Sequence, residues 1–445
     1  MSSSTKINFR SEAFSKYFKN TGWLLGEKVI RILFGFTVNI LLVRYLGAEE
    51  FGVFSYALSY VGIFAALATL GLDSIITREI VNHPEDKQKI LGSVFLLRLS
   101  GAVIAFILIC ITLFITGETS LNAFFILVLS AGMFFQSFYV IEFFFHAQVK
   151  GKLVAIVQSI SLITASLLKI LFIYLQAPLI YFVIFQVVEI LLIAIGLVIV
   201  FQKSDENIFV WKFNKSIAKR LLIDAWPLTI AGVVIGIYMK IDQIMIEKML
   251  NSKELGYYAS AVRLCEVWYF IPMVISTSLF PAILNAKKID TNLYNSRLQK
   301  LYDLMAFISI AIAVPVTFLS PWIMTTLYGN EFLLGATVLT IYIWAGVPTF
   351  LGVASSQFLI SENLTKISFY RTLAGMIANV ALNFLLIPKY GINGAASATL
   401  VSYSIATFSI GMTKQTYNQL GMMLRSIFFF SLIKSVGINV RKIFR

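Results

Sequence analysis

Charge and histidine are both scarce in this chain, and each scarcity excludes a class of protein. Only 13% of the 445 residues are charged and 58% are apolar, against roughly a quarter charged and ~45–50% apolar in soluble globular domains. A soluble fold of this length could not bury so much apolar surface, so lipid must cover the excess. The two histidines, His83 and His146, have no partner motif for general-base catalysis or metal binding.

Other chemistry-bearing motifs are also missing. Cys110 and Cys265 lie in apolar runs, without a CxxC pattern or a disulfide framework. No GxxxxGK[ST] loop for ATP is present. We therefore expect a protein that is not an enzyme and that has no cofactor or metal site. The net charge of +14 is explained by basic loops at the cytoplasmic face of a membrane, and we expect no nucleic-acid partner.

Apolar stretches of about 20 residues, long enough to cross roughly 30 Å of hydrocarbon, recur along the whole chain. They predict an all-α integral membrane protein with twelve transmembrane helices, at 22–43, 51–71, 91–115, 121–145, 153–175, 179–201, 222–247, 255–283, 301–327, 332–360, 367–387 and 391–412. The run IFFFSLI in the tail is too short to span and is expected to lie in the interface. A thirteenth helix within 420–440 is the alternative.

Lysine and arginine gather on one side of the predicted topology. The opposite loops hold only Arg44, Lys248, Lys253 and Lys389. The other side carries the N-terminal segment, the 72–90 loop and the basic C-terminal tail, together with Lys150, Lys152, Lys203, Lys212, Lys215, Lys219, Arg220, Lys287, Lys288, Arg297, Lys300, Lys366 and Arg371. By the positive-inside rule both termini lie in the cytoplasm, which requires an even number of spans.

An internal repeat divides the chain into two halves. The segments LGAEEFGVFSYA (46–57) and LNSKELGYYASA (250–261) align at an offset of 204, which pairs Gly52 with Gly256. We expect each glycine to let the chain turn tightly between two helices. Two parallel six-helix repeats predict a substrate path between them. The expected regions are a cytoplasmic N-terminal segment 1–21, an N-lobe 22–201, a cytoplasmic linker 202–221, a C-lobe 222–413 and a basic tail 414–445.

Ionisable residues inside spans cost at least ~2.5–3.5 kcal/mol each, so they are functional candidates. The deep set is Arg31, Arg98, Lys169, Glu189, Lys240, Asp242, Arg263 and Glu266. Two local ion pairs are structural alternatives, namely Glu27 with Arg31 and Arg263 with Glu266.

Three members of the deep set are stronger candidates. Arg98 has no acidic neighbour on its own helix, and Lys240 and Asp242 point away from each other. We expect at least one of the latter two to find a partner on another helix or in a watery cavity. Ordinary interfacial roles are expected for three acids near helix ends, namely Glu142, Asp224 and Glu247.

Several segments taken together resemble the polysaccharide transporter family, which includes the Wzx-type O-antigen and capsule repeat-unit flippases of the multidrug/oligosaccharidyl-lipid/polysaccharide exporter superfamily. The resemblance covers about residues 15–415. The segments that carry it are GLDSIITREI (71–80), IDQIMIEKMLNSKELGYYASAVRLCEVWYFIP (241–272), SLFPAIL (278–284) and KYGINGAASATLVSY (389–403). The combination of IDQIMI (241–246) and ELGYYASA (254–261) is the most specific part, and no single segment would suffice.

The resemblance implies two six-helix lobes around a central cavity in the bacterial inner membrane. It implies that undecaprenyl-diphosphate-linked oligosaccharides are carried from the inner to the outer leaflet for O-antigen, capsule or exopolysaccharide synthesis. By position, Arg31, Arg98, Lys240 and Arg263 would bind the substrate. Coupling to H⁺ or Na⁺ is implied, and we assign it to Asp242 first and to Glu189 second. Membrane lipids and polymerase or chain-length proteins are the expected partners.

Three alternatives remain open. The first is another exporter of the same superfamily, for lipid II or for drugs and cations. The second is a membrane glycan polymerase or ligase, although the predicted outer loops are too short to carry such an enzyme's chemistry. The third is a scaffold protein, against which the deep charges argue.

Overall fold

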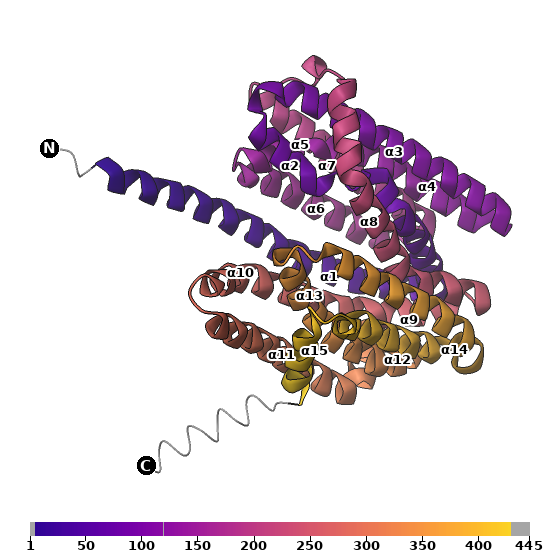
Figure 1. Cartoon of the computed structure of the whole chain (residues 1–445). Coiled ribbons are helices and arrows are strands. Elements are labelled where there is room, and N and C mark those ends of the chain that lie inside the picture. The colour runs from indigo at the N-terminus through magenta and orange to yellow at the C-terminus, as the bar shows by residue number, and fades with distance from the viewer. Residues whose placement is uncertain (1–4, 119, 429–445) are drawn as a thin grey trace, which may run out of the picture. The chain divides into compact units, whose positions relative to one another are not determined.

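The computed structural model describes residues 5–118 and 120–428, and within them every regular element is helical (Figure 1). Ten helical segments of this part of the chain are long and apolar enough to cross a membrane. The chain divides into two compact units. Unit 1 runs to Leu46 and from Tyr56 to Gly236, and unit 2 comprises Gly47–Ser55 and the chain from Ile237 onward. The division therefore falls within one helix, whereas the sequence analysis began the C-lobe at residue 222.

The α-helices follow one another with short connections. They are α1 Thr5–Thr69, α2 Asp73–Asn82, α3 Lys87–Thr116, α4 Ser120–Gln136, α5 Val140–Ala147, α6 Gly151–Tyr174, α7 Leu179–Lys203, α8 Lys215–Met249, α9 Ser252–Glu266, α10 Phe270–Lys287, α11 Thr291–Tyr328, α12 Gly335–Tyr342, α13 Gly346–Ser361, α14 Thr365–Phe408 and α15 Tyr417–Ile427. Short 3₁₀ helices join several of them, and the relevant ones are η2 Ser137–Tyr139, η3 Ile208–Val210, η4 Val267–Tyr269 and η6 Ile343–Ala345.

Helix α1 contains two membrane crossings, because the chain reverses at Gly47 (φ 70°, ψ 179°). Before this residue, the Arg31 side chain contacts Gln158 near the start of α6, and the Tyr45 hydroxyl bonds the Ala177 carbonyl beyond the end of α6. This part of α1 therefore runs parallel to α6.

After Gly47 the chain runs the other way, along α3. The Tyr56 hydroxyl donates to Glu118 beyond the end of α3, whereas the carbonyl of Ala68 lies against Gly101 in the middle of α3. This part of α1 is therefore antiparallel to α3. A backbone with φ of 70° is one that glycine adopts without steric cost, which explains why the reversal occurs at Gly47.

Helix α14 contains a second reversal, at Gly391 (φ 57°, ψ −140°). A Cβ atom built on Gly394 would lie 2.3 Å from the Leu386 carbonyl oxygen, eight residues earlier in the chain. Farther from the reversal on both sides, Gly375 lies close to the Ser402 carbonyl. The two parts of α14 are therefore antiparallel. With these two reversals, the ten apolar segments of the described residues contain twelve helical stretches.

Three of the predicted spans are interrupted midway by a 3₁₀ turn. Two of these turns precede a proline, Pro272 in α10 and Pro348 in α13. Proline lacks the N–H that would bond the carbonyl four residues earlier, so the α-helical ladder is broken there. The third interruption contains no proline. The interrupted spans are 121–145, 255–283 and 332–360.

Two segments that the sequence analysis treated as connections are ordered parts of unit 1. Helix α2 lies inside the expected 72–90 loop, and its Ile75, Ile76 and Ile80 belong to the hydrophobic core of the unit. In the expected linker 202–221, the Trp211 side chain packs against Phe95 and Phe201 (ring centroids 5.5 and 5.8 Å apart). The linker is thus fixed to the unit that precedes it.

The tail begins with α15, which is too short to cross the membrane. It packs against α11, where the Tyr302 hydroxyl donates to Gln419 (2.8 Å) and the Gln299 amide donates to Ser426 (2.8 Å). Most of the IFFFSLI run lies outside the described residues, as does the rest of the alternative thirteenth helix.

Candidate functional site

The first group of deep charges joins α1, α5 and α6 within unit 1. The Arg31 guanidinium forms an ion pair with Glu27 (Nε to Oε1, 2.6 Å) and donates to the Gln158 side-chain oxygen (3.2 Å). The Gln158 amide in turn donates to Glu142 (3.0 Å). The local pair between Glu27 and Arg31 is confirmed. Glu142 belongs to the same network through Gln158. This contact could not be predicted from the sequence, because Gln158 lies on the next helix.

Arg98 lies in the interior of unit 1, with 3% of its surface exposed. Its Nη1 atom is 2.8 Å from Asp73 Oδ1 at the start of α2, and the guanidinium lies over the Phe143 ring (5.7 Å to the centroid). The prediction correctly excluded a partner on its own helix. Asp73 was not predicted as the partner, because the expected 72–90 loop is in part the helix α2, which packs on α3.

Lys169 on α6 and Glu189 on α7 form a second interhelical ion pair in unit 1. The Lys169 Nζ atom is 2.8 Å from Glu189 Oε2, and both side chains are mostly buried (15% and 14% exposed). The charge of Glu189, a candidate for ion coupling, is therefore compensated by Lys169 in this structure.

In unit 2, Lys240 on α8 is paired with Glu266 on α9. The Lys240 Nζ atom lies 3.6 Å from Glu266 Oε1, and no hydrogen bond reaches that oxygen from any described residue. The partner of Lys240 thus comes from another helix. The alternative local pair between Arg263 and Glu266 is absent from the described contacts, since Glu266 is paired with Lys240.

Arg263 differs from the other candidate cations. Its side chain is exposed, and no described residue forms an ion pair or hydrogen bond with it. Because α9 begins at Ser252, a rise of 1.5 Å per residue places Arg263 about 16 Å along the helix, near the middle of a hydrocarbon layer of roughly 30 Å. An arginine at this depth is strongly disfavoured against lipid, so it is expected to face water or a polar ligand.

Asp242 on α8 lies at the centre of a buried polar cluster in unit 2. Its carboxylate accepts hydrogen bonds from the Tyr258 hydroxyl and from the Gln243 backbone amide (2.8 Å), and only 3% of the residue is exposed. The Tyr258 hydroxyl also lies 3.4 Å from the Thr399 hydroxyl on α14. No described cation lies within ion-pair distance of Asp242, and its direct partners are hydrogen-bond donors.

The same cluster continues along α14 through two asparagines. The Asn383 amide donates to the Asn379 oxygen (3.0 Å), and Asn379 approaches Thr399 (3.5 Å). The buried Asn383 side-chain oxygen has no hydrogen-bond donor among the described residues. A buried oxygen without a donor is uncommon and needs an explanation. Together these residues supply several oxygen atoms beside one carboxylate.

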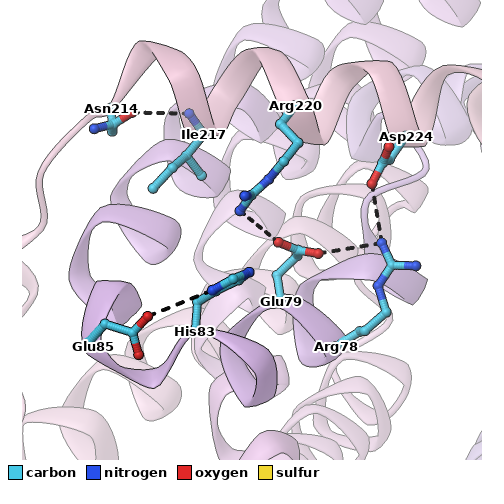
Figure 2. A network of polar contacts seen from close by, with 8 residues as sticks. All are labelled: Arg78, Glu79, His83, Glu85, Asn214, Ile217, Arg220 and Asp224. Carbon is cyan, nitrogen blue, oxygen red and sulfur yellow. Dashed lines mark hydrogen bonds and ion pairs between the residues drawn. The ribbon is translucent and has the colours of Figure 1, made fainter.

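A network of polar contacts fixes the beginning of α8 to α2 (Figure 2). Glu79, which is 7% exposed, accepts from Arg220 (2.9 Å) and lies 3.5 Å from Arg78, while Arg78 also reaches Asp224 (3.2 Å). We call these four residues the α2–α8 clasp. Asp224 is thus the exposed end of an ion-pair network. The sequence analysis did not single out Glu79.

A second set of contacts fixes the linker just before α8. Lys87 Nζ lies 2.5 Å from Glu206, and the Asn214 backbone amide donates to the Ser93 hydroxyl (2.9 Å). A Cβ atom on Gly92 would lie 2.7 Å from the Lys212 backbone nitrogen, so glycine is required for this approach.

The chain is similar to known proteins over most of its length. A family model described as "Polysaccharide biosynthesis protein" matches residues 17–287. A "Putative O-antigen transporter" of Shigella flexneri is 22% identical over 409 residues, covering 87% of this chain and 94% of that protein. The "Capsular polysaccharide biosynthesis protein CapF" of Staphylococcus aureus is 20% identical over 395 residues, covering 88% of this chain and 97% of that protein.

Among solved structures, "Lipid II flippase MurJ, inward closed conformation" aligns with a TM-score of 0.66 at 18% identity. The alignment covers 94% of this chain and 93% of that one. At this identity the likeness shows the fold, and the predicted all-helical, two-lobe fold of a membrane protein is confirmed.

Proposed function

Because the chain belongs to the polysaccharide biosynthesis protein family, we propose that it flips undecaprenyl-diphosphate-linked oligosaccharide repeat units from the inner to the outer leaflet of the bacterial inner membrane. The chain is a polysaccharide transporter of the multidrug/oligosaccharidyl-lipid/polysaccharide exporter superfamily. The finer assignment to this lipid-linked substrate is supported by the names of the relatives and by the charges within the helices. Both termini would lie in the cytoplasm, on the basic side of the bundle.

The physical problem of such a reaction is the polar head group. Each sugar hydroxyl moved unpaired into hydrocarbon costs roughly 4–8 kcal/mol, and an ionised diphosphate costs far more. Spontaneous flipping is therefore negligible. A transporter must supply polar partners and cations along the path, while the polyprenyl tail stays in the bilayer.

The observation that carries the proposal is that Arg263 is exposed and forms no ion pair with a described residue. Arg31, Arg98 and Lys240 each lie beside a carboxylate, so a phosphate would have to displace that carboxylate before binding them. Arg263 has no such competitor among the described residues and is exposed at mid-membrane depth. A guanidinium binds phosphate oxygens in a bidentate manner. We assign the diphosphate contact to Arg263 and rank Arg31, Arg98 and Lys240 behind it as candidates.

The energy for directional transport would come from a cation gradient acting at Asp242. A membrane potential supplies ~2.3 kcal/mol per charge per 100 mV. Asp242 is buried without a cationic partner, and the oxygen atoms of Thr399, Asn379 and Asn383 lie in the same cluster. Either H⁺ or Na⁺ would neutralise it. Glu189 is the less favoured site, because Lys169 already compensates its charge.

The test replaces Arg263 with methionine in a strain whose surface glycan depends on this gene. We expect glycan display to stop and lipid-linked repeat units to accumulate in the cytoplasmic leaflet, measured by labelling from each side of the membrane. Lys253→Met is the matched control, because Lys253 is an exposed cation on the same helix near its outer end. It should display glycan normally.

Two outcomes would contradict the proposal. Normal display by Arg263→Met, with the protein present at wild-type level, would remove Arg263 from the substrate path. Accumulation of repeat units in the outer leaflet of the deletion strain would indicate a polymerase or ligase instead of a flippase.

A further inference from the structure

Arg371 is a buried cation that has only neutral partners. It lies on α14 in unit 2 and is 8% exposed. Its Nη1 atom donates to the Ser355 hydroxyl (2.6 Å), and Nη2 donates to the Ser356 hydroxyl (2.5 Å) and to the Gly352 carbonyl (3.1 Å). All three acceptors belong to α13. No carboxylate among the described residues lies within ion-pair distance of this guanidinium.

Four other buried or half-buried cations of the spans each have a carboxylate partner. Carboxylates face Arg31, Arg98, Lys169 and Lys240. The acid nearest to Arg371 in sequence, Glu362, is occupied by Lys287 (2.6 Å) and by the Tyr294 hydroxyl (3.2 Å). Burying a charge without a counter-charge costs several kcal/mol. Apolar packing could join α13 to α14 without that cost. We therefore infer that the charge serves to bind an anion from outside the chain.

The depth of Arg371 identifies the chemistry of that anion. Arg371 is six residues beyond the start of α14 at Thr365, or about 9 Å along the helix. This places it near the boundary between head groups and hydrocarbon, where the phosphates of lipids lie. Two N–H groups of a guanidinium remain available when three are used, and arginine binds phosphate readily. Both Nη2 hydrogens are taken by Gly352 and Ser356, so the N–H groups left for a ligand are the Nε–H and the second Nη1–H. Gly352 and Ser356 are half-buried, so α13 is not fully covered beside this guanidinium.

We propose that Arg371, with Ser355 and Ser356, forms a phosphate-binding site that receives the diphosphate of the lipid-linked substrate. The proposal rests on the flippase function above and adds an entry site to it. In the structure the two serine hydroxyls and the Gly352 carbonyl act as acceptors for the guanidinium. When a phosphate arrives, its oxygens accept from the free N–H groups, and the hydroxyls can rotate to donate to it. The site takes an anionic phosphate ester.

A substitution that supplies an internal counter-charge separates this proposal from a structural role. In Ser355→Asp the new carboxylate would take the place of the hydroxyl that binds Nη1. If Arg371 only joins two helices, this ion pair strengthens the joint and leaves phosphate binding and transport unchanged. If Arg371 binds phosphate, the carboxylate competes with the ligand. Arg371→Met removes the cation directly, and Gln357→Glu adds the same charge to α13 at a residue without a described contact to Arg371.

The experiment uses full-length protein in phosphatidylcholine nanodiscs, titrated with undecaprenyl diphosphate. We expect Arg371→Met and Ser355→Asp each to bind this probe at least tenfold more weakly than the wild type, and Gln357→Glu to bind within twofold of it. The Ser355→Asp variant should unfold at the wild-type temperature or above, which keeps the test valid if Arg371→Met does not fold.

Three results would overturn the proposal. They are no binding of undecaprenyl diphosphate by the wild type, equal binding by Ser355→Asp, and equally tight binding of phosphatidylglycerol, which would indicate a site for bulk lipid. A parallel assay of glycan display separates the two proposals. If the wild-type gene fails to restore display in the deletion strain, the flippase function is wrong, whereas the nanodisc titration still decides whether Arg371 binds phosphate.

Discussion

Gly52 and Gly256, which occupy equivalent positions in the two copies of the repeat, each lie against the backbone of the other copy. A Cβ atom on Gly52 would be 1.7 Å from the Ser252 carbonyl oxygen, and one on Gly256 would be 1.8 Å from the Ala48 carbonyl oxygen. All four residues belong to unit 2. From the sequence, these glycines are expected to permit a tight turn. Their role is instead close approach, because the positive φ that reverses the chain belongs to Gly47.

Replacing either glycine with alanine should therefore destabilise the protein severely. Overpacking of a closed contact typically costs 1–3 kcal/mol, and a carbonyl closer than 2 Å puts these sites at about 3 kcal/mol or more. The unfolding temperature in detergent measures the effect. Gly346→Ala is the control, because nothing lies within 4 Å of the added atom and alanine is the better helix former. Wild-type unfolding temperatures for both Gly52→Ala and Gly256→Ala would contradict this packing.

The α2–α8 clasp leads to a second prediction. Glu79 is nearly buried and receives Arg220 and Arg78, so Glu79→Gln should leave two guanidiniums without their shared acceptor. Loss of such a charge-assisted bond costs roughly 1.5–3 kcal/mol. We expect faster proteolysis at 202–221 and a lower unfolding temperature. Glu85→Gln, in which an exposed carboxylate changes, should behave as the wild type.

A charge exchange tests whether the clasp acts through Arg220 itself. The double variant Glu79→Arg with Arg220→Glu should recover part of the stability that either single variant loses, because the ion pair is restored in reverse. Additive losses in the double variant would show that Glu79 and Arg220 do not interact.

The pair formed by Lys169 and Glu189 gives a third prediction, which also tests Glu189 as a coupling residue. Lys169→Met alone leaves a buried carboxylate unpaired and should cost about 3–5 kcal/mol. The double variant Lys169→Met with Glu189→Leu removes both charges, and its stability should return close to the wild type. If glycan display and its gradient dependence survive in the double variant, the pair is structural. Loss of gradient dependence in this folded protein would assign coupling to Glu189.

The spans could be predicted from the sequence because each needs only its own length and hydropathy. The expected helix at 153–175 and α6 at Gly151–Tyr174 agree within a few residues. The two parts of α1 and the two parts of α14 were each expected as separate spans. The 3₁₀ interruptions were not expected, although Pro272 and Pro348 signalled two of them.

The partners of the charges could not be predicted in the same way. Which helix lies beside Arg98 depends on lateral packing and on helix rotation, and neither leaves a periodic signal in one sequence. Asp73 was hidden because a short amphipathic helix resembles a polar loop in composition. In the sequence, Arg371 is a charge near the end of an expected helix, and such a charge usually reaches water. Its burial became apparent only from α13, whose Ser355 and Ser356 hold it.

The last prediction concerns Asp242, which forms no ion pair with a described cation. If a gradient acts here, Asp242→Asn should mimic the cation-bound state permanently, because the amide is neutral and of similar size. Flipping measured in proteoliposomes should then lose its response to an imposed gradient. Tyr258→Phe keeps the carboxylate and removes one of its hydrogen bonds. It should therefore remain responsive, with a changed cation affinity. Stimulation of the wild type by a sodium gradient at constant pH would identify Na⁺, and stimulation by a pH gradient without sodium would identify H⁺. An undiminished response in Asp242→Asn would exclude Asp242 as the coupling site, because no titratable or coordinating carboxylate would remain at that position.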